Sequence, residues 1–189
     1  MTIFYVMQTG RTTWEDQARV EPTAGSPLSA QGVQTVRDIA EQLRDKSLGA
    51  VHAGAGQSEQ QAAALAAKTL GLKVRTDERL GEIDYGLWQG LTVEEIKRSQ
   101  PTRYKQWIES PSSVSPPGGE SLVQATQRLQ QALGDIAKHR RKSPALLVLR
   151  PVMVGLLRCL LRGEPIDSVW KNVDPAFAWE RCETENDKT

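Results

Sequence analysis

The chain opens with Ile3-Phe4-Tyr5-Val6-Met7-Gln8-Thr9-Gly10-Arg11-Thr12-Thr13, and this stretch decides the fold class. Residues 3–7 form a short apolar run, which is typical of a buried strand, and small polar residues follow it at once. A strand that ends in a polar loop is the usual first unit of an α/β fold, whose ligands bind beyond the carboxyl ends of the strands. The residues that follow each apolar run are therefore the informative ones for function.

Short strands and longer helices alternate along the rest of the chain. Ser29 can cap a helix whose apolar residues are three or four apart, and Gly71 can end an alanine-rich helix over residues 58–70. The other predicted elements are strands at 48–52, 72–74 and 145–149, helices at 120–139 and 151–161, and an edge strand at about 177–182. This alternation predicts an α/β protein, a three-layer α/β/α sandwich with a mostly parallel central sheet.

The pattern loosens between residues 80 and 119. Gly81, Gly86 and Gly90 interrupt it, and residues 92–95 form a capping box. We expect a lid-like insertion at about 80–119 within a single domain that spans residues 1–189. The length of 189 residues suits one domain with its own hydrophobic core.

The composition excludes several classes of protein. Basic residues number 24 and acidic residues 23, so the chain lacks the basic excess of proteins that bind nucleic acid or anionic membranes. Cys159 and Cys182 have no metal-ligand spacing around them, which favours a reducing compartment and predicts no metal site. We expect no nucleic-acid partner and no cofactor.

Neither the amino terminus nor the most apolar segment indicates a membrane. The amino terminus lacks the basic region, the longer apolar core and the cleavage site of a signal peptide. Residues 144–161 are interrupted by Arg150, Pro151 and Arg158, so they cannot cross a bilayer as one helix. We expect a cytoplasmic protein with no membrane partner.

Several fragments of the sequence carry a resemblance to a known family. They are Val6–Trp14, in which Gly10, Thr12 and Trp14 match, then Pro27–Gly32, Arg79–Thr92 and Pro117–Ser121. In this order and spacing they resemble the histidine phosphatase superfamily of the phosphoglycerate mutase type, across about residues 3–160. The resemblance implies the phosphoglycerate mutase-like fold.

The chemistry that the resemblance implies depends on five positions. In the family a first His accepts the phosphoryl group, a Glu or Asp protonates the leaving oxygen, and two Arg and a second His hold the phosphoryl oxygens. The first Arg-His pair aligns with Gln8 and Thr9, the second Arg with Ser58, and the second His with Arg150. Only Glu82 matches the family.

These replacements predict a protein that has lost the family's catalysis. A threonine hydroxyl is a poor nucleophile without an adjacent base, and none is evident beside Thr9. The prediction is a pseudophosphatase with a binding or regulatory role. Its partner would be a small anionic or polar ligand, or another protein. The predicted degenerate pocket consists of Gln8, Thr9, Gly10, Arg11, Thr12, Ser58, Glu82 and Arg150.

Other interpretations stay open at this point. A divergent phosphomonoesterase could use a rebuilt site of His52, Glu82 and Arg150, and the domain could also act as a subunit of a homodimer. Arg150 could bind an anion together with the amino end of the following helix, or it could pair with Glu82 across the vacated pocket. Arg11 is expected to be a solvated loop charge. Trp14 could line a ligand cavity, whereas the other tryptophans are expected in the core or lid.

Overall fold

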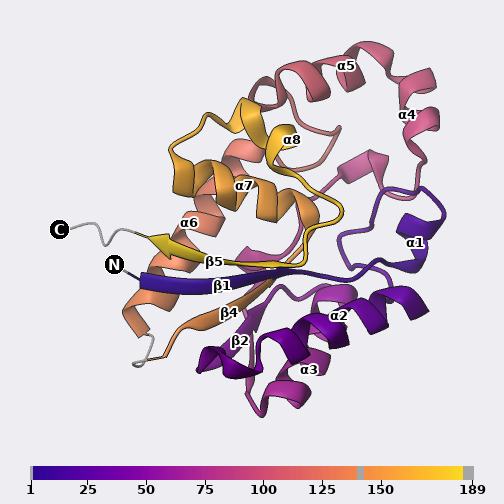
Figure 1. Ribbon diagram of the computed structural model, residues 1–189. Helices are drawn as coiled ribbons and strands as arrows, with labels where there is room; N and C mark the ends of the chain where they lie inside the picture. Colours follow the sequence, from indigo (N-terminus) through magenta and orange to yellow (C-terminus); the bar gives the residue numbers. More distant parts are fainter. Residues whose placement is uncertain (1, 140–142, 185–189) are drawn as a thin grey trace.

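A computed structural model describes residues 2–139 and 143–184 and shows a central five-stranded sheet (Figure 1). Its strands are β1 (Thr2–Gln8), β2 (Ala50–Ala53), β3 (Val74–Thr76), β4 (Ala145–Leu149) and β5 (Trp179–Thr184). They lie in the order β3-β2-β4-β1-β5. The first four are parallel, and β5 is antiparallel to β1 at one edge. The predicted α/β class is confirmed.

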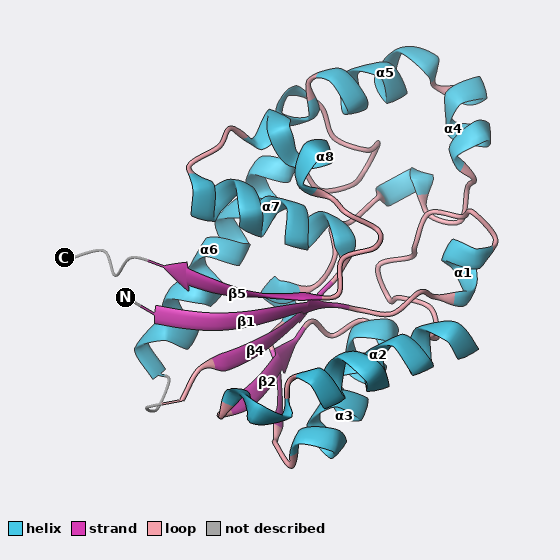
Figure 2. Ribbon diagram, viewed as in Figure 1, coloured by secondary structure: helices cyan, strands magenta, loops and turns pink. Residues whose placement is uncertain are grey.

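Helices cover both faces of this sheet. They are α1 (Thr13–Asp16), α2 (Ala30–Gln42), α3 (Gln57–Leu70), α4 (Val93–Ser99), α5 (Pro101–Glu109), α6 (Leu122–His139), α7 (Pro151–Arg162) and α8 (Val169–Asn172). Short 3-10 helices lie at Arg44–Lys46, Glu78–Leu80, Gly86–Trp88, Pro111–Ser113 and Ile166–Ser168. In Figure 2, α2 and α3 lie on one side of the sheet and α6 and α7 on the other, which gives the three layers.

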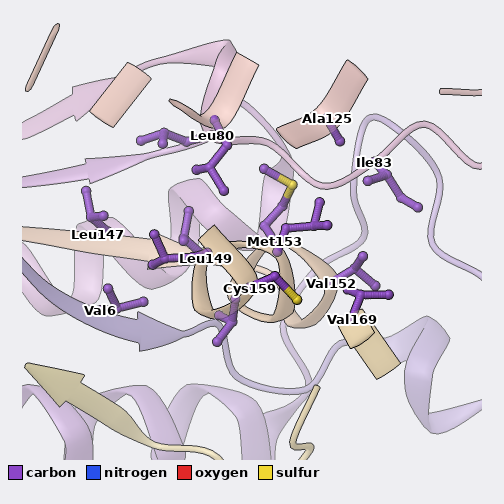
Figure 3. Packing of buried hydrophobic residues seen from close by; sticks show 14 of the residues in the cluster. Val6, Leu80, Ile83, Ala125, Leu147, Leu149, Val152, Met153, Cys159 and Val169 are labelled. Carbon is purple, nitrogen blue, oxygen red and sulfur yellow. The ribbon is translucent and has the colours of Figure 1, made fainter. Parts of the chain in front are cut away.

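Two hydrophobic clusters follow from the alternation of side chains along the strands. Phe4 and Val6 of β1 join the cluster under α6 and α7, whereas Tyr5 and Met7 join the cluster under α2 and α3. All five residues of β4 are buried, as expected of a central parallel strand covered on both faces. Figure 3 shows side chains of the first cluster packed around α7.

Some element boundaries differ from the sequence prediction. The third strand was expected at 72–74 but runs from Val74 to Thr76, because Gly71 ends α3 in the left-handed conformation and Leu72 still donates its N–H to Ala67. The edge strand was expected at 177–182 and is Trp179–Thr184. These shifts of two residues leave the order of elements unchanged.

The segment at 80–119 carries two helices, of which the sequence indicated only the first. Thr92 forms the predicted capping box with Glu95 and begins α4. Pro101 then occupies the first turn of α5, where its missing N–H costs nothing. Ile96 of α4 and Trp107 of α5 are buried in the cluster under α6 and α7. No helix in the described residues is long and apolar enough to span a membrane.

Candidate functional site

The loops that leave the carboxyl ends of β1 and β4 begin side by side. Gln8 and Leu149 are register partners in these parallel strands, and the N–H of Thr9 donates to the carbonyl of Leu149 at 2.9 Å. Arg150 follows immediately and precedes the first residue of α7. Its Nη1 lies 3.4 Å from Oγ of Ser58, in the first turn of α3. The topology thus brings together three residues of the predicted pocket: Thr9, Ser58 and Arg150.

The guanidinium of Arg150 is held by carboxylates. Only 3% of the residue is exposed, and its Nη2 lies 2.9 Å from Oε1 of Glu15 and 3.8 Å from Oε1 of Glu21. Burial acts to lower the pKa of Arg150, but the charges of Glu15, Glu82, Glu21 and Glu59 outweigh it and raise that pKa. Arg150 is therefore a permanent buried cation.

The sequence offered Glu82 as the ion-pair partner of Arg150, and that pairing is wrong. The direct ion pairs of Arg150 among the described residues are with Glu15 and Glu21. The carboxylate of Glu82 instead accepts backbone N–H groups, from Ile83 at 2.9 Å and from Val152 at 3.2 Å. Glu82 acts on Arg150 through its charge.

The loop after β1 positions the two glutamates. Thr12 caps α1 and forms a capping box with Glu15, whose Oε2 accepts the N–H of Thr12 at 3.0 Å. The hydroxyl of Thr12 donates to Glu21, and the hydroxyl of Ser26 lies 2.9 Å from Oε2 of Glu21. The predicted pocket residue Thr12 is thus a support for both carboxylates. The spacing Thr-x-x-Glu at 12–15 is a signal that the sequence analysis missed.

Glu59 and Glu82 complete the set of carboxyl groups near Arg150. Glu59 is buried beside Ser58, whose hydroxyl lies 3.0 Å from its Oε2, and it accepts the N–H of Glu82 at 3.4 Å. Burial raises the pKa of Glu82 to about 7; Arg150 and the two backbone donors oppose this shift, and the charge of Glu59 adds to it. The Glu82 carboxyl therefore keeps its proton to a higher pH than a solvent-exposed glutamate does.

The first strand end contributes oxygen atoms that lack partners. Gln8 and Thr9 are buried, and neither Oε1 of Gln8 nor Oγ1 of Thr9 has a hydrogen-bond partner in the described part of the chain. No His, Asp or Glu of that part accepts a proton from Thr9, so its hydroxyl has no base. Gly10 packs backbone to backbone against α2, where a Cβ would lie 2.2 Å from the carbonyl oxygen of Gly32. Arg11 is exposed and pairs with Asp16 at 2.9 Å, as expected of a loop charge.

A cavity of about 300 Å³ opens above Arg150. Its lining includes the carboxyl-bearing residues Glu15, Glu21 and Glu82, and the basic residues Arg19 and Arg150. The remaining lining residues are Val20, Tyr85, Trp88, Val93, Ile96, Tyr104, Trp107, Ile108, Pro151, Val152 and Trp170. A second hollow, of about 420 Å³, also contacts Glu82 and is lined by polar loop residues with Arg128. The first cavity is the apolar one, with its charges gathered around Arg150.

Other sequence candidates lie outside this arrangement. His52 lines neither cavity; its pKa is lowered by burial and then by the charge of Arg75, while Asp77 opposes the shift. Trp14 does not line either cavity and instead contacts Gly90. No cluster of three or more His, Cys, Asp or Glu in residues 2–139 and 143–184 is placed to hold a metal ion.

The fold and the position of this cavity define the class of protein: an α/β sandwich whose site lies beyond the carboxyl ends of parallel strands. The chain matches the histidine phosphatase superfamily (branch 1) over residues 4–189 and belongs to that superfamily.

Its relatives carry the names of phosphatases and mutases. The chain is 25% identical over 170 residues to phosphoserine phosphatase 1 of Hydrogenobacter thermophilus, covering 90% of this chain and 81% of the relative. It is 30% identical over 163 residues to a probable phosphoglycerate mutase of an Enterobacter species, covering 85% and 75%. The solved structure of Bacillus stearothermophilus YhfR superposes with a TM-score of 0.85 at 25% identity, covering 90% of this chain and 84% of that one.

Proposed function

We infer that this chain is a pseudophosphatase, a member of the superfamily that binds a small molecule at the former catalytic site without transferring a phosphoryl group. The observation that carries this inference is the set of four glutamates around Arg150, beside a Thr9 hydroxyl that has no base. Both the nucleophile and the charge of the site differ from what phosphoryl transfer requires.

The nucleophile is the first difference. A phosphoryl acceptor must lose a proton or carry a free lone pair on nitrogen, and the Thr9 hydroxyl has neither advantage. The imidazole of His52 is the other acceptor that the sequence suggested. It lines neither cavity, and the charges of Arg75 and Asp77 act on it rather than those of Glu82 and Arg150. The rebuilt site of a divergent phosphomonoesterase therefore gains no support from this geometry.

The charge of the site is the second difference. A phosphoryl group in contact with Arg150 would also approach Glu15 and Glu21, which lie 2.9 and 3.8 Å from the same Nη2. Two unit charges about 4 Å apart repel by about 4 kcal/mol at an effective dielectric constant of about 20. The repulsion from these carboxylates offsets the attraction of the guanidinium, so the charges argue against the small anionic ligand predicted from the sequence.

The test is an assay of the purified chain with p-nitrophenyl phosphate, together with a search for an acid-labile phosphoprotein. We expect hydrolysis at the rate of buffer alone and no phosphoprotein. Hydrolysis that disappears in His52→Ala would establish the divergent phosphomonoesterase. Hydrolysis that survives in His52→Ala but disappears in Thr9→Val would also overturn the proposal, because Thr9 would then be the acceptor.

A further inference from the structure

The charges at the base of the cavity do not balance. Three glutamates that line the cavity, Glu15, Glu21 and Glu82, act on the single buried guanidinium of Arg150, and so does Glu59, which lies outside the lining. Arg19 also lines the cavity, but it is exposed and donates to the carbonyl of Gly90. Buried charges are costly unless they are compensated, so this arrangement lacks positive charge.

The carboxylates that line the cavity keep capacity for further hydrogen bonds. Each oxygen of Glu82 accepts one backbone N–H, from Ile83 or from Val152, and each carboxylate oxygen has two acceptor positions. Oε1 of Glu15 accepts from Arg150 and Oε2 from Thr12. A ligand that donates hydrogen bonds could therefore bind Glu15 and Glu82 without displacing the existing donors. Oε1 of Glu21 already accepts from Thr12 and Ser26, so Glu21 would act on such a ligand through its charge.

Two uncharged side chains, Gln8 and Tyr85, carry further polar oxygens in this part of the fold. Gln8 is more than nine-tenths buried and lies on the β1 face of Phe4 and Val6, the face covered by the cluster that includes Trp88 and Trp107. Its Oε1 lacks a partner in the described residues. Tyr85 lines the cavity near the same charges, since Glu82, Arg150, Glu15 and Glu21 all act on its hydroxyl. The Tyr85 hydroxyl therefore adds a polar group beside the carboxylates, whereas Gln8 is not among the residues that line the cavity.

Above the charges, the walls of the cavity are apolar and largely aromatic. Trp88 and Trp107 meet edge to face with ring centroids 5.8 Å apart, and Trp107 meets Trp170 in the same way at 5.2 Å. Tyr104, Val93 and Ile108 complete these walls. The volume of about 300 Å³ is at the lower end for small-molecule sites. Such walls suit the apolar body of a small ligand, and their rings attract cations.

We propose that this cavity binds a small organic cation: a primary ammonium group at its base, against Glu15, Glu21 and Glu82, joined to an apolar body between the aromatic walls. This proposal rests on the proposed function, because it places the ligand where the family holds a phosphoryl group. The charge of the ligand is opposite to that of a phosphate ester.

The test is isothermal titration calorimetry with four probes of similar shape: phenethylamine, 2-phenylethanol, phenylacetate and phenyl phosphate. We expect phenethylamine to bind at neutral pH. The neutral alcohol is expected to bind at least tenfold more weakly, because a tenfold change in Kd corresponds to roughly the free energy of one charge-assisted hydrogen bond. The two anions are expected to show no binding. Binding of phenyl phosphate as tight as that of the amine, or no binding of the amine, would overturn the proposal.

Two variants locate the bound amine. Glu15→Gln removes one charge and keeps the size of the side chain, with one oxygen that can still accept from Arg150, so we expect amine affinity to fall about tenfold. Ile108 is 45% exposed at the cavity wall, and Ile108→Arg adds a cation there without disturbing the core; it is also expected to weaken the amine. Glu41→Gln, on the exposed face of α2, is the matched control and should bind as the parent does. Unchanged affinity in both cavity variants would refute the location.

The outcomes separate this proposal from the proposed function. Absence of amine binding together with absence of phosphate hydrolysis would refute the organic cation and leave the pseudophosphatase standing. Hydrolysis of p-nitrophenyl phosphate would refute the pseudophosphatase, whether or not the amine binds.

Discussion

The substitution Glu82→Gln tests the electrostatics of the cavity most directly. In the unfolded chain this carboxyl loses its proton near its ordinary pKa of 4.5, whereas in the folded chain it keeps the proton up to a pKa of about 7. Between these values the folded state binds more protons, so raising the pH favours unfolding. The stabilising contribution of the protonated group is complete below the unfolded pKa and is lost as the pH rises through the folded pKa.

The magnitude follows from the difference between the two pKa values. A shift from 4.5 to about 7 corresponds to about 3 kcal/mol, since one unit of pKa is worth about 1.4 kcal/mol. Glutamine cannot ionise, and its one carbonyl oxygen keeps one of the two backbone N–H bonds; the loss of the other bond does not depend on pH. We therefore expect the variant to gain up to about 3 kcal/mol of unfolding free energy relative to the parent between about pH 4 and pH 8.

Urea denaturation across that pH range measures the effect. Glu41→Gln is the control. The hydrogen bond from Arg44 lowers the pKa of Glu41, so the contribution of Glu41 to the unfolding free energy rises with pH instead of falling. If the parent and Glu82→Gln lose stability in parallel as the pH rises, then the folded state does not hold the Glu82 proton, and the account of this site as short of positive charge fails.

Two further predictions concern the groups around Arg150. Arg150→Met leaves the buried Glu21 and the half-buried Glu15 without their cation, so we expect a loss of about 3–5 kcal/mol of unfolding free energy in urea denaturation, with Arg150→Lys losing less. A loss below about 1 kcal/mol would show that the ion pairs are dispensable. Thr12→Val removes both the cap of α1 and the donor to Glu21, so we expect a loss of about 2 kcal/mol of unfolding free energy. Thr12→Ser keeps the hydroxyl and should lose much less. Equal losses in both variants would show that packing of the side chain, and not its hydroxyl, matters.

The order of elements could be predicted from the sequence because local signals agree with the tertiary structure. The apolar run at 145–149 has the composition of a strand buried on both faces, and it occupies the middle of the sheet. Ser29 caps α2 through the N–H of Gly32, as its position before an amphipathic segment indicated. Such signals depend on residues a few positions apart in the sequence, so they can be recognised without knowing the tertiary contacts.

Apart from Glu82, the carboxylates of the site could not be predicted in the same way. Glu15 and Arg150 are 135 residues apart, and their contact depends on the path of the loop after β1. The overall formal charge of +1 gives no sign of four glutamates gathered around one guanidinium. Ser58, in the first turn of α3, and Arg150, directly after β4, could be identified because the parallel sheet fixes where the strands end and the next helices begin. No comparable rule fixes where the residues of a long loop lie.

The identity of Arg150 bears on why the site retains so many carboxylates. An imidazole at this position would titrate near neutrality and could exchange a proton, whereas a guanidinium stays protonated and only donates hydrogen bonds. The buried cation therefore stabilises Glu15 and Glu21 at every physiological pH, and those carboxylates in turn keep it charged. Because each group depends on the other, replacing Arg150 by His alone would leave the glutamates undercompensated. For this site to bind a phosphate, the carboxylates would have to be replaced as well as imidazoles introduced at Thr9 and Arg150.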